Sequence, residues 1–260
     1  MPGIDVWLSA LHGSHDRLVE VAGGLSAQQV SGPSYASEWS IAQVLSHLGS
    51  GAEIFSLFLQ AGAQGQPAPA VEDFQPIWKG WDAKAPADQA SDSLKADAEF
   101  LGQLDALTPQ QREQWSLSLF GASQGLADLL RLRLGEHAVH VWDIAVMQDE
   151  RATLAAGVVA LLIDGIGQLV ARAGKPTLEA LRVAVITEQP TRQFVLVADN
   201  AHVALEADQT ANSAGDEGRL RLPAEALIRL IYGRLDARHT PEVAAEAVDL
   251  DALRQLFPGF

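Results

Sequence analysis

A chain of 260 residues with 48% hydrophobic side chains can bury a full core, which argues against a disordered protein and suits one or two domains. Its formal net charge of −15 repels phosphate backbones and anionic lipids, which argues against nucleic-acid and membrane-surface partners. The absence of cysteine excludes disulfides, zinc–thiolate sites and a cysteine nucleophile.

The first residues, Met1 to Asp5, lack the basic and apolar segments of a signal peptide. The longest apolar run, Ala155 to Ile163, is too short to span a bilayer. We therefore expect a cytoplasmic protein with no membrane partner.

The first half of the chain contains four segments with apolar residues at three- and four-residue spacing, which is typical of amphipathic helices. Ser40 and Gln43 form a capping box that predicts the start of the second helix. The predicted helices cover about Ile4–Ala22, Ser40–Ala61, Ala87–Leu107 and Ser123–Met147. With a glycine- and proline-rich connection at 61–69, they predict an antiparallel four-helix bundle over residues 1–150, with almost no strand.

The second half of the chain changes in character after Gln148–Arg151, where we place the domain boundary. A helix is expected over Ala152–Ala173, and a second one opens at Pro223 and runs to about Tyr232. Short segments rich in β-branched residues predict strands at Leu181–Thr187, Gln193–Ala198, His202–Ala207 and Gly218–Leu222. Residues 151–260 are thus predicted to form a smaller α/β domain.

Two potential metal ligands, Glu136 and His140, lie four residues apart on the fourth predicted helix. This spacing places them on one helix face about 6 Å apart along the axis. The pattern alone is common on solvated helices. Here the surrounding helix is apolar almost all round, however, and a buried carboxylate and imidazole need a partner such as a cation.

The second predicted helix supplies another candidate ligand, His47, within the apolar stretch Val44–Leu48. Taken by itself, His47 could equally be a core histidine bonded to a hydroxyl or a backbone carbonyl. The tryptophans Trp78 and Trp81 precede the third helix, where they either cover a pocket or, as we favour, anchor the connection in the core.

Two stretches of this sequence resemble signatures of a known family. Glu38–Leu48 is similar to the pattern W-S/T-x-x-x-V-L-x-H-L of DinB-like bundles, and Gly135–Ala145 is similar to E-x-x-x-H-x-x-D-L/I-A. The second pattern belongs to the mycothiol-dependent maleylpyruvate isomerase family. The resemblance implies a DinB-like four-helix bundle followed by a smaller C-terminal α/β domain.

The resemblance also implies a metal site. Family members bind zinc through three residues that correspond here to His47, Glu136 and His140. Three protein ligands leave a fourth position open, as in catalytic zinc sites. A thiol bound there is held as thiolate, which fits the use of mycothiol, the sugar-linked cysteine thiol of actinobacteria. The implied cofactors are therefore Zn²⁺, or another divalent metal, and mycothiol.

Two further residues are assigned to the chemistry through the resemblance. Arg234 matches a family arginine that follows an apolar helix, where it would bind a carboxylate of the thiol cofactor or the substrate. A solvated arginine at a helix C-terminus is the alternative. Asp143 matches a family aspartate and would orient a metal ligand through a hydrogen bond, unless it is a surface carboxylate.

The function predicted from these features is a zinc-dependent isomerase or S-transferase acting on a small electrophile. A hydrolase that uses metal-activated water is an alternative, because the same ligands permit it. A non-catalytic protein that binds metal and an apolar ligand is a third. The sequence identifies neither the substrate nor the oligomeric state.

Overall fold

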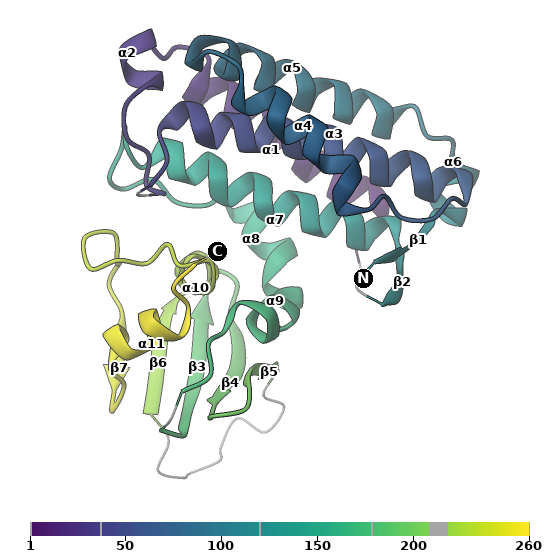
Figure 1. Cartoon of the computed structure of the whole chain (residues 1–260). Coiled ribbons are helices and arrows are strands. Elements are labelled where there is room, and N and C mark those ends of the chain that lie inside the picture. The colour runs from purple at the N-terminus through teal and green to yellow at the C-terminus, as the bar shows by residue number, and fades with distance from the viewer. Residues whose placement is uncertain (1, 37, 120, 178, 208–217, 260) are drawn as a thin grey trace. The chain divides into compact units, whose positions relative to one another are not determined.

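The computed structural model describes residues 2–36, 38–119, 121–177, 179–207 and 218–259. The chain divides into two compact units, residues 1–152 and 153–260 (Figure 1). The first unit is helical with one short hairpin, and the second contains a five-stranded sheet with helices. The predicted fold class, a helical domain followed by a smaller α/β domain, is confirmed.

The first unit contains seven helices and two strands within the described residues. In chain order they are α1 (Ile4–Ala22), α2 (Ala27–Val30), α3 (Ile41–Gln64), α4 (Val71–Asp82), α5 (Pro86–Asp105), α6 (Pro109–Gln114), β1 (Ser116–Leu119), β2 (Ala122–Gly125) and α7 (Leu126–Ala145). The capping box at the start of α3 is confirmed: the Ser40 hydroxyl accepts from the Gln43 amide, and the Gln43 side chain accepts from the Ser40 amide.

Four long helices form the bundle, in which α1 and α3 each contact both α5 and α7. Their directions differ from the simple antiparallel bundle that the sequence predicts. Late residues of α3 and α5 lie together, as the Gln60–Gln103 hydrogen bond of 3.2 Å shows, and Ala90 and Leu94 of α5 pack near the start of α3. Helices α3 and α5 therefore run parallel to each other.

Helix α4 is the physical reason for this direction, and the sequence prediction missed it. It runs back along α3 (Figure 1), so that α5 can start again at the same end of the bundle as α3. Its Trp81 is 2% exposed and packs on Gly49 of α3, where an added Cβ would lie 2.1 Å from the indole ring. Core anchoring is thus confirmed for Trp81, whereas Trp78 is 40% exposed.

The hairpin β1–β2 corrects the predicted start of the fourth helix. Ser118 pairs with Ser123, and Gly121 at the turn has a φ of 78°, which glycine adopts without strain. Ser123 is a favourable helix-capping residue, but here it pairs within strand β2, which extends to Gly125. The helix therefore begins at Leu126.

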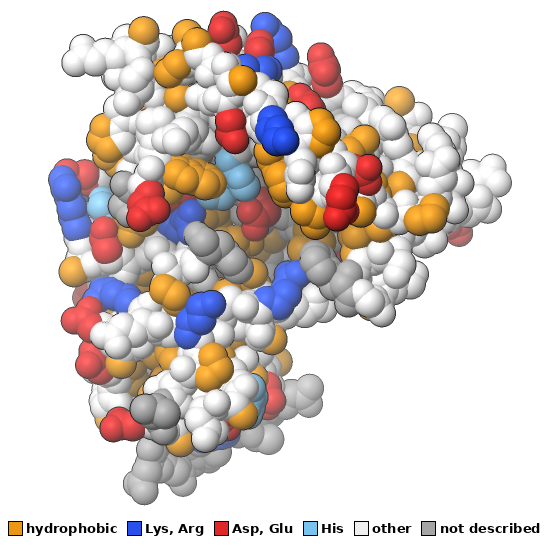
Figure 2. All heavy atoms as spheres, in the orientation of Figure 1, with side chains coloured by type: hydrophobic (Ala, Val, Ile, Leu, Met, Phe, Trp, Pro, Cys, Tyr) orange, Lys and Arg blue, Asp and Glu red, His pale blue; other side chains and the backbone are white. Residues whose placement is uncertain are grey.

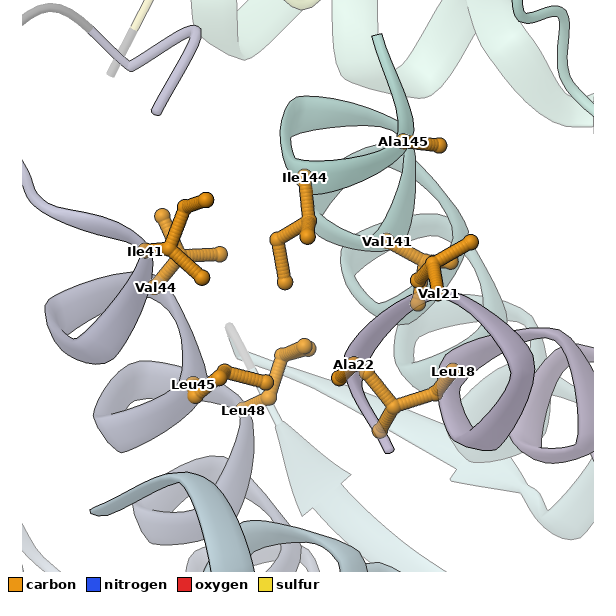
Figure 3. Packing of buried hydrophobic residues seen from close by; sticks show 10 residues of the cluster. All are labelled: Leu18, Val21, Ala22, Ile41, Val44, Leu45, Leu48, Val141, Ile144 and Ala145. Carbon is orange, nitrogen blue, oxygen red and sulfur yellow. The ribbon is translucent and has the colours of Figure 1, made fainter. Parts of the chain in front are cut away.

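Apolar side chains from three of the long helices form one core cluster (Figure 3). The cluster joins the last turns of α1 and α7 to the first turns of α3, and each fully buried leucine in it contributes roughly 2 kcal/mol relative to an exposed one. Its members are Leu18, Val21, Ala22, Ile41, Val44, Leu45, Leu48, Val141, Ile144 and Ala145. This packing holds the beginning of α3 against the end of α7.

The second unit contains a mixed sheet with strand order β5-β4-β3-β6-β7; among the residues that the structure describes, the β3–β6 pairing is parallel and the other three pairings are antiparallel. Val183, Val185 and Leu220 are buried on one face of the sheet, the face covered by helices. The elements are α8 (Ala156–Leu162), η1 (Ile163–Gly165), α9 (Ile166–Ala173), β3 (Leu181–Glu188), β4 (Arg192–Ala198), β5 (Val203–Ala207), β6 (Gly218–Pro223), α10 (Ala224–Ile231), β7 (Ala244–Glu246) and α11 (Leu250–Leu256).

The single helix expected over Ala152–Ala173 is wrong, because a 3-10 turn at Ile163–Gly165 divides it into α8 and α9. Ala156–Ala173 is nevertheless one stretch of 18 residues with a mean hydropathy of 1.5, and among the described residues it alone is long and apolar enough to cross a membrane. Such a stretch is weak support for a membrane span, since a core helix of a soluble protein has the same composition.

The division into two units leads to a prediction about folding. A fragment of residues 1–152 should be soluble, helical and cooperative in thermal unfolding, because it retains the whole core cluster of Figure 3. Far-UV circular dichroism against temperature measures this. A fragment ending at Gly125 lacks α7 and serves as an unfolded control; a 1–152 fragment that behaves like it would contradict the prediction.

Candidate metal centre

The structure brings together the three residues that the sequence proposes as metal ligands. His47 projects from the second turn of α3, and Glu136 and His140 project from one face of α7. Glu136 Oε2 lies 3.8 Å from Nε2 of His47 and 3.8 Å from Nε2 of His140, and all three donor atoms lie within 4.8 Å of one another. Among the described residues, no other group of at least three His, Asp or Glu side chains has this geometry.

The donor atoms suit a divalent metal in type and nearly in spacing. Donors around a tetrahedral zinc lie roughly 3.4 Å apart, given bonds of about 2.1 Å. The side chains of His47 and Glu136 are 39% and 40% exposed, so small rotations can close the remaining gap. Two imidazoles and one carboxylate suit zinc, and they also suit iron(II).

His140 is oriented by Asp143, one turn further along α7. His140 Nδ1 donates to Oδ2 of Asp143 at 2.9 Å, and the Asp143 side chain is completely buried. A carboxylate oxygen accepts, so the proton sits on Nδ1 and the lone pair of Nε2 faces His47 and Glu136. The structure excludes the surface carboxylate that the sequence left open; the role of Asp143 in the chemistry stays a prediction.

The pKa of His140 is lowered, chiefly because burial disfavours the charged ring. The hydrogen bond to Asp143 acts in the opposite direction, and the neighbouring His47 lowers the pKa further. His140 is therefore neutral at physiological pH, which is the form that binds a metal.

The indole ring of Trp39 borders the donor atoms, a position that the sequence does not predict. Trp39 lies 5.3 Å from the ring of His47 and 6.1 Å from that of His140, measured between ring centroids, and it is 37% exposed. On the surface of the helical unit, histidine side chains lie beside hydrophobic and acidic ones (Figure 2). The donor atoms are therefore accessible to solvent and have an aromatic ring beside them.

Arg234 lies in the second unit, directly after Gly233, whose φ is 74°. Its side chain is 8% exposed, and Nη1 donates to the carbonyl of Tyr232. The solvated arginine considered from the sequence is therefore wrong, while its assignment to the chemistry remains a prediction.

The remaining histidines of the first unit lie apart from the donors. His12 is exposed and pairs with Asp105. His15 and His137 both donate to Asp97, and His137 is buried in the bundle.

The N-terminal unit matches a family model described as the mycothiol maleylpyruvate isomerase N-terminal domain, over residues 11–145. A crystal structure of the mycothiol-dependent maleylpyruvate isomerase has the same fold, with a TM-score of 0.68, 10% sequence identity and coverage of 94% of this chain and 93% of that chain. A histidine-to-alanine mutant of that isomerase gives the same values. The chain has no match among curated protein sequences.

The convergence of three donors predicts that His47→Ala removes bound metal. The purified protein should carry about one divalent ion per chain, and the variant should carry little, because two donors bind far more weakly than three. Elemental analysis after desalting measures the ratio. His12→Ala, which alters an exposed histidine elsewhere, is the control. Full metal occupancy in His47→Ala would exclude His47 from the site.

The Asp143 contact predicts a second effect on metal binding. Asp143→Asn removes the negative charge that holds His140, and the metal affinity should fall by about 10- to 100-fold. Asp128→Asn on the same helix removes a carboxylate that pairs with Arg131 and should leave the affinity unchanged. Competition with a chromophoric chelator measures both variants, and equal affinities would show that Asp143 does not support the ligand.

Proposed function

This chain belongs to the mycothiol maleylpyruvate isomerase family, and on that premise we propose that it is a metal-dependent enzyme that uses mycothiol to isomerise, or transfer the thiol to, a small electrophilic substrate. The observation that carries the proposal is the convergence of His47, Glu136 and His140 at a solvent-accessible place on the bundle. We take zinc as the metal.

The three side chains would hold the metal from the protein side, and their partial exposure leaves room for a ligand from solvent. The bound ion would keep a thiol ligand deprotonated at neutral pH. The chain has no cysteine, so the nucleophile has to be supplied by a small molecule.

The proposed reaction needs no other reagent. The thiolate sulfur forms a bond to one carbon of an activated cis alkene, and the π electrons move into the conjugated carbonyl group. Rotation about the resulting single bond, followed by loss of the same thiolate, gives the trans isomer. If the adduct instead takes up a proton and is released, the enzyme is an S-transferase.

The protein side chains around the donors have defined tasks in this scheme. Asp143 keeps the proton on Nδ1 of His140, which leaves Nε2 for the metal. Trp39 offers an aromatic face beside the donors, suited to a planar, conjugated substrate. We assign Arg234 to a carboxylate of the thiol or the substrate, as its guanidinium suits bidentate binding. We also propose a cytoplasmic location, where low-molecular-weight thiols are kept reduced.

The decisive prediction concerns thiol binding. Isothermal calorimetry should detect mycothiol binding to the zinc-loaded protein and none to the metal-free protein, because the sulfur binds at the metal. His47→Ala treated with zinc should behave like the metal-free form. Absence of binding to the loaded protein at millimolar thiol would overturn the proposal, and substrate cleavage without thiol would indicate a hydrolase instead.

Arg234 is tested separately by kinetics with maleylpyruvate and mycothiol. Arg234→Ala should lower kcat/KM by about 100-fold, the cost of one lost charge-assisted contact of roughly 3 kcal/mol, and leave zinc content unchanged. Arg238→Ala, at an exposed position four residues later, is the control. Equal turnover in both variants would remove Arg234 from the site.

A further inference from the structure

A second cluster of polar side chains lies in the centre of the bundle, away from solvent and distinct from the metal donors. Its members are at most 5% exposed, although most are charged or titratable; they are Ser14, Asp97, Arg133 and His137. They come from α1, α5 and α7, and we call them the buried polar cluster.

Asp97 is the centre of the cluster. Its Oδ1 accepts from Arg133 Nη2 at 2.7 Å, and its Oδ2 accepts from His137 Nε2 at 3.0 Å and from His15 Nδ1 at 2.8 Å. Burial by itself raises the pKa of the Asp97 carboxyl, but His137, His15 and Arg133 outweigh it and hold the pKa far below its ordinary value. The carboxylate is thus a fixed anion.

Arg133 links this anion to the helix that carries His47. The same Nη2 atom donates to the backbone carbonyl of Leu48 at 3.1 Å. The guanidinium also lies near two neighbouring aromatic rings, 5.6 Å from the centroid of Phe55 and 5.8 Å from that of Phe100. Leu48 directly follows His47 in α3, and Arg133 precedes Glu136 by one turn in α7. One side chain therefore connects the two helices that hold the metal donors.

Stability does not account for this arrangement. Buried ion pairs cost so much desolvation that apolar replacements are often as stable or more stable. The Nε atom of Arg133 is moreover buried without a hydrogen-bond partner among the described residues, which carries a further penalty. A side chain that is unfavourable in this way is better explained by the geometry it imposes.

We propose that Arg133, fixed by Asp97, is a positioning residue that sets the distance between His47 on α3 and the Glu136–His140 pair on α7, and thereby the affinity for the metal. This role rests on the proposed metal site and identifies a further residue that determines its affinity for the metal. Neither Arg133 nor Asp97 touches the metal or the substrate in this scheme.

Gly51 of α3 provides a way to disturb the link without removing a charge. A Cβ added at Gly51 would lie 2.9 Å from Nη1 of Arg133, which is closer than van der Waals contact allows. Alanine is also the better helix former by about 1 kcal/mol, so Gly51→Ala should not weaken α3 itself. Gly102, inside α5, has nothing within 4 Å of an added Cβ and supplies the matched control, Gly102→Ala.

The test measures zinc affinity by chelator competition and the visible absorption of the cobalt(II)-loaded protein, which reports ligand geometry. The variants are Gly51→Ala, Gly102→Ala and the double variant Arg133→Met with Asp97→Asn, which removes both charges together. Arg131→Met, on the same helix but paired with Asp128, controls for loss of an arginine. Circular dichroism confirms that each protein is folded at the measuring temperature.

The proposal expects the double variant to bind zinc roughly ten-fold or more weakly and Gly51→Ala roughly three-fold more weakly. Both should show shifted cobalt bands, while both controls match the unaltered protein. If the double variant does not fold, Gly51→Ala decides alone. Unchanged affinity and cobalt bands in the folded variants would overturn the positioning role with the metal site intact. Absence of zinc binding in the unaltered protein would overturn the proposed function, and this inference with it.

Discussion

Most residues of helix α7 are buried, so that the buried polar groups on it need partners within the protein. Polar side chains of α7 have such partners on two neighbouring helices, α3 and α5. Glu136 and His140 face His47 of α3, and Arg133 and His137 face Asp97 of α5. One helix thus contributes both to the metal donors and to the polar cluster beside them.

The direction of the helices decides which parts of the chain meet at the donors. Because α4 returns the chain along the bundle, α3 and α5 run parallel, and the first turns of α3 lie against the last turns of α7. A simple antiparallel order of the four helices would place α5 differently relative to α3. The interior position of Asp97, within reach of Arg133 and close to the Leu48 carbonyl, depends on this crossover.

The chemistry proposed for the protein follows from what the site provides and what the chain lacks. Two half-exposed donors and one buried donor allow a metal to be held while a ligand approaches from solvent. Neutral His140, fixed by Asp143, supplies a lone pair without competition from protons. A chain without cysteine then has to receive its sulfur nucleophile from a small molecule.

The sequence by itself determined the local features of this protein. Helical periodicity placed the four long helices, and the Ser40 capping box fixed the start of α3. Segments rich in β-branched residues located β3, β4, β5 and β6 of the second unit but not β7. These signals act over a few neighbouring residues. The spacing of Glu136 and His140 on one helix face is a signal of the same kind.

Tertiary structure decided what depends on partners far apart in the chain. The sequence prediction missed α4, a short helix that contains a proline, Pro76, and has one buried side chain, Trp81. It also missed the β1–β2 hairpin, whose strands are too short to show alternation. Asp97 and Arg133 look like surface charges in the sequence, and Trp39 carries no sign of its place beside two histidines. Their roles arise from contacts between helices that only the packed bundle creates, since no local pattern encodes which buried charge will meet which partner.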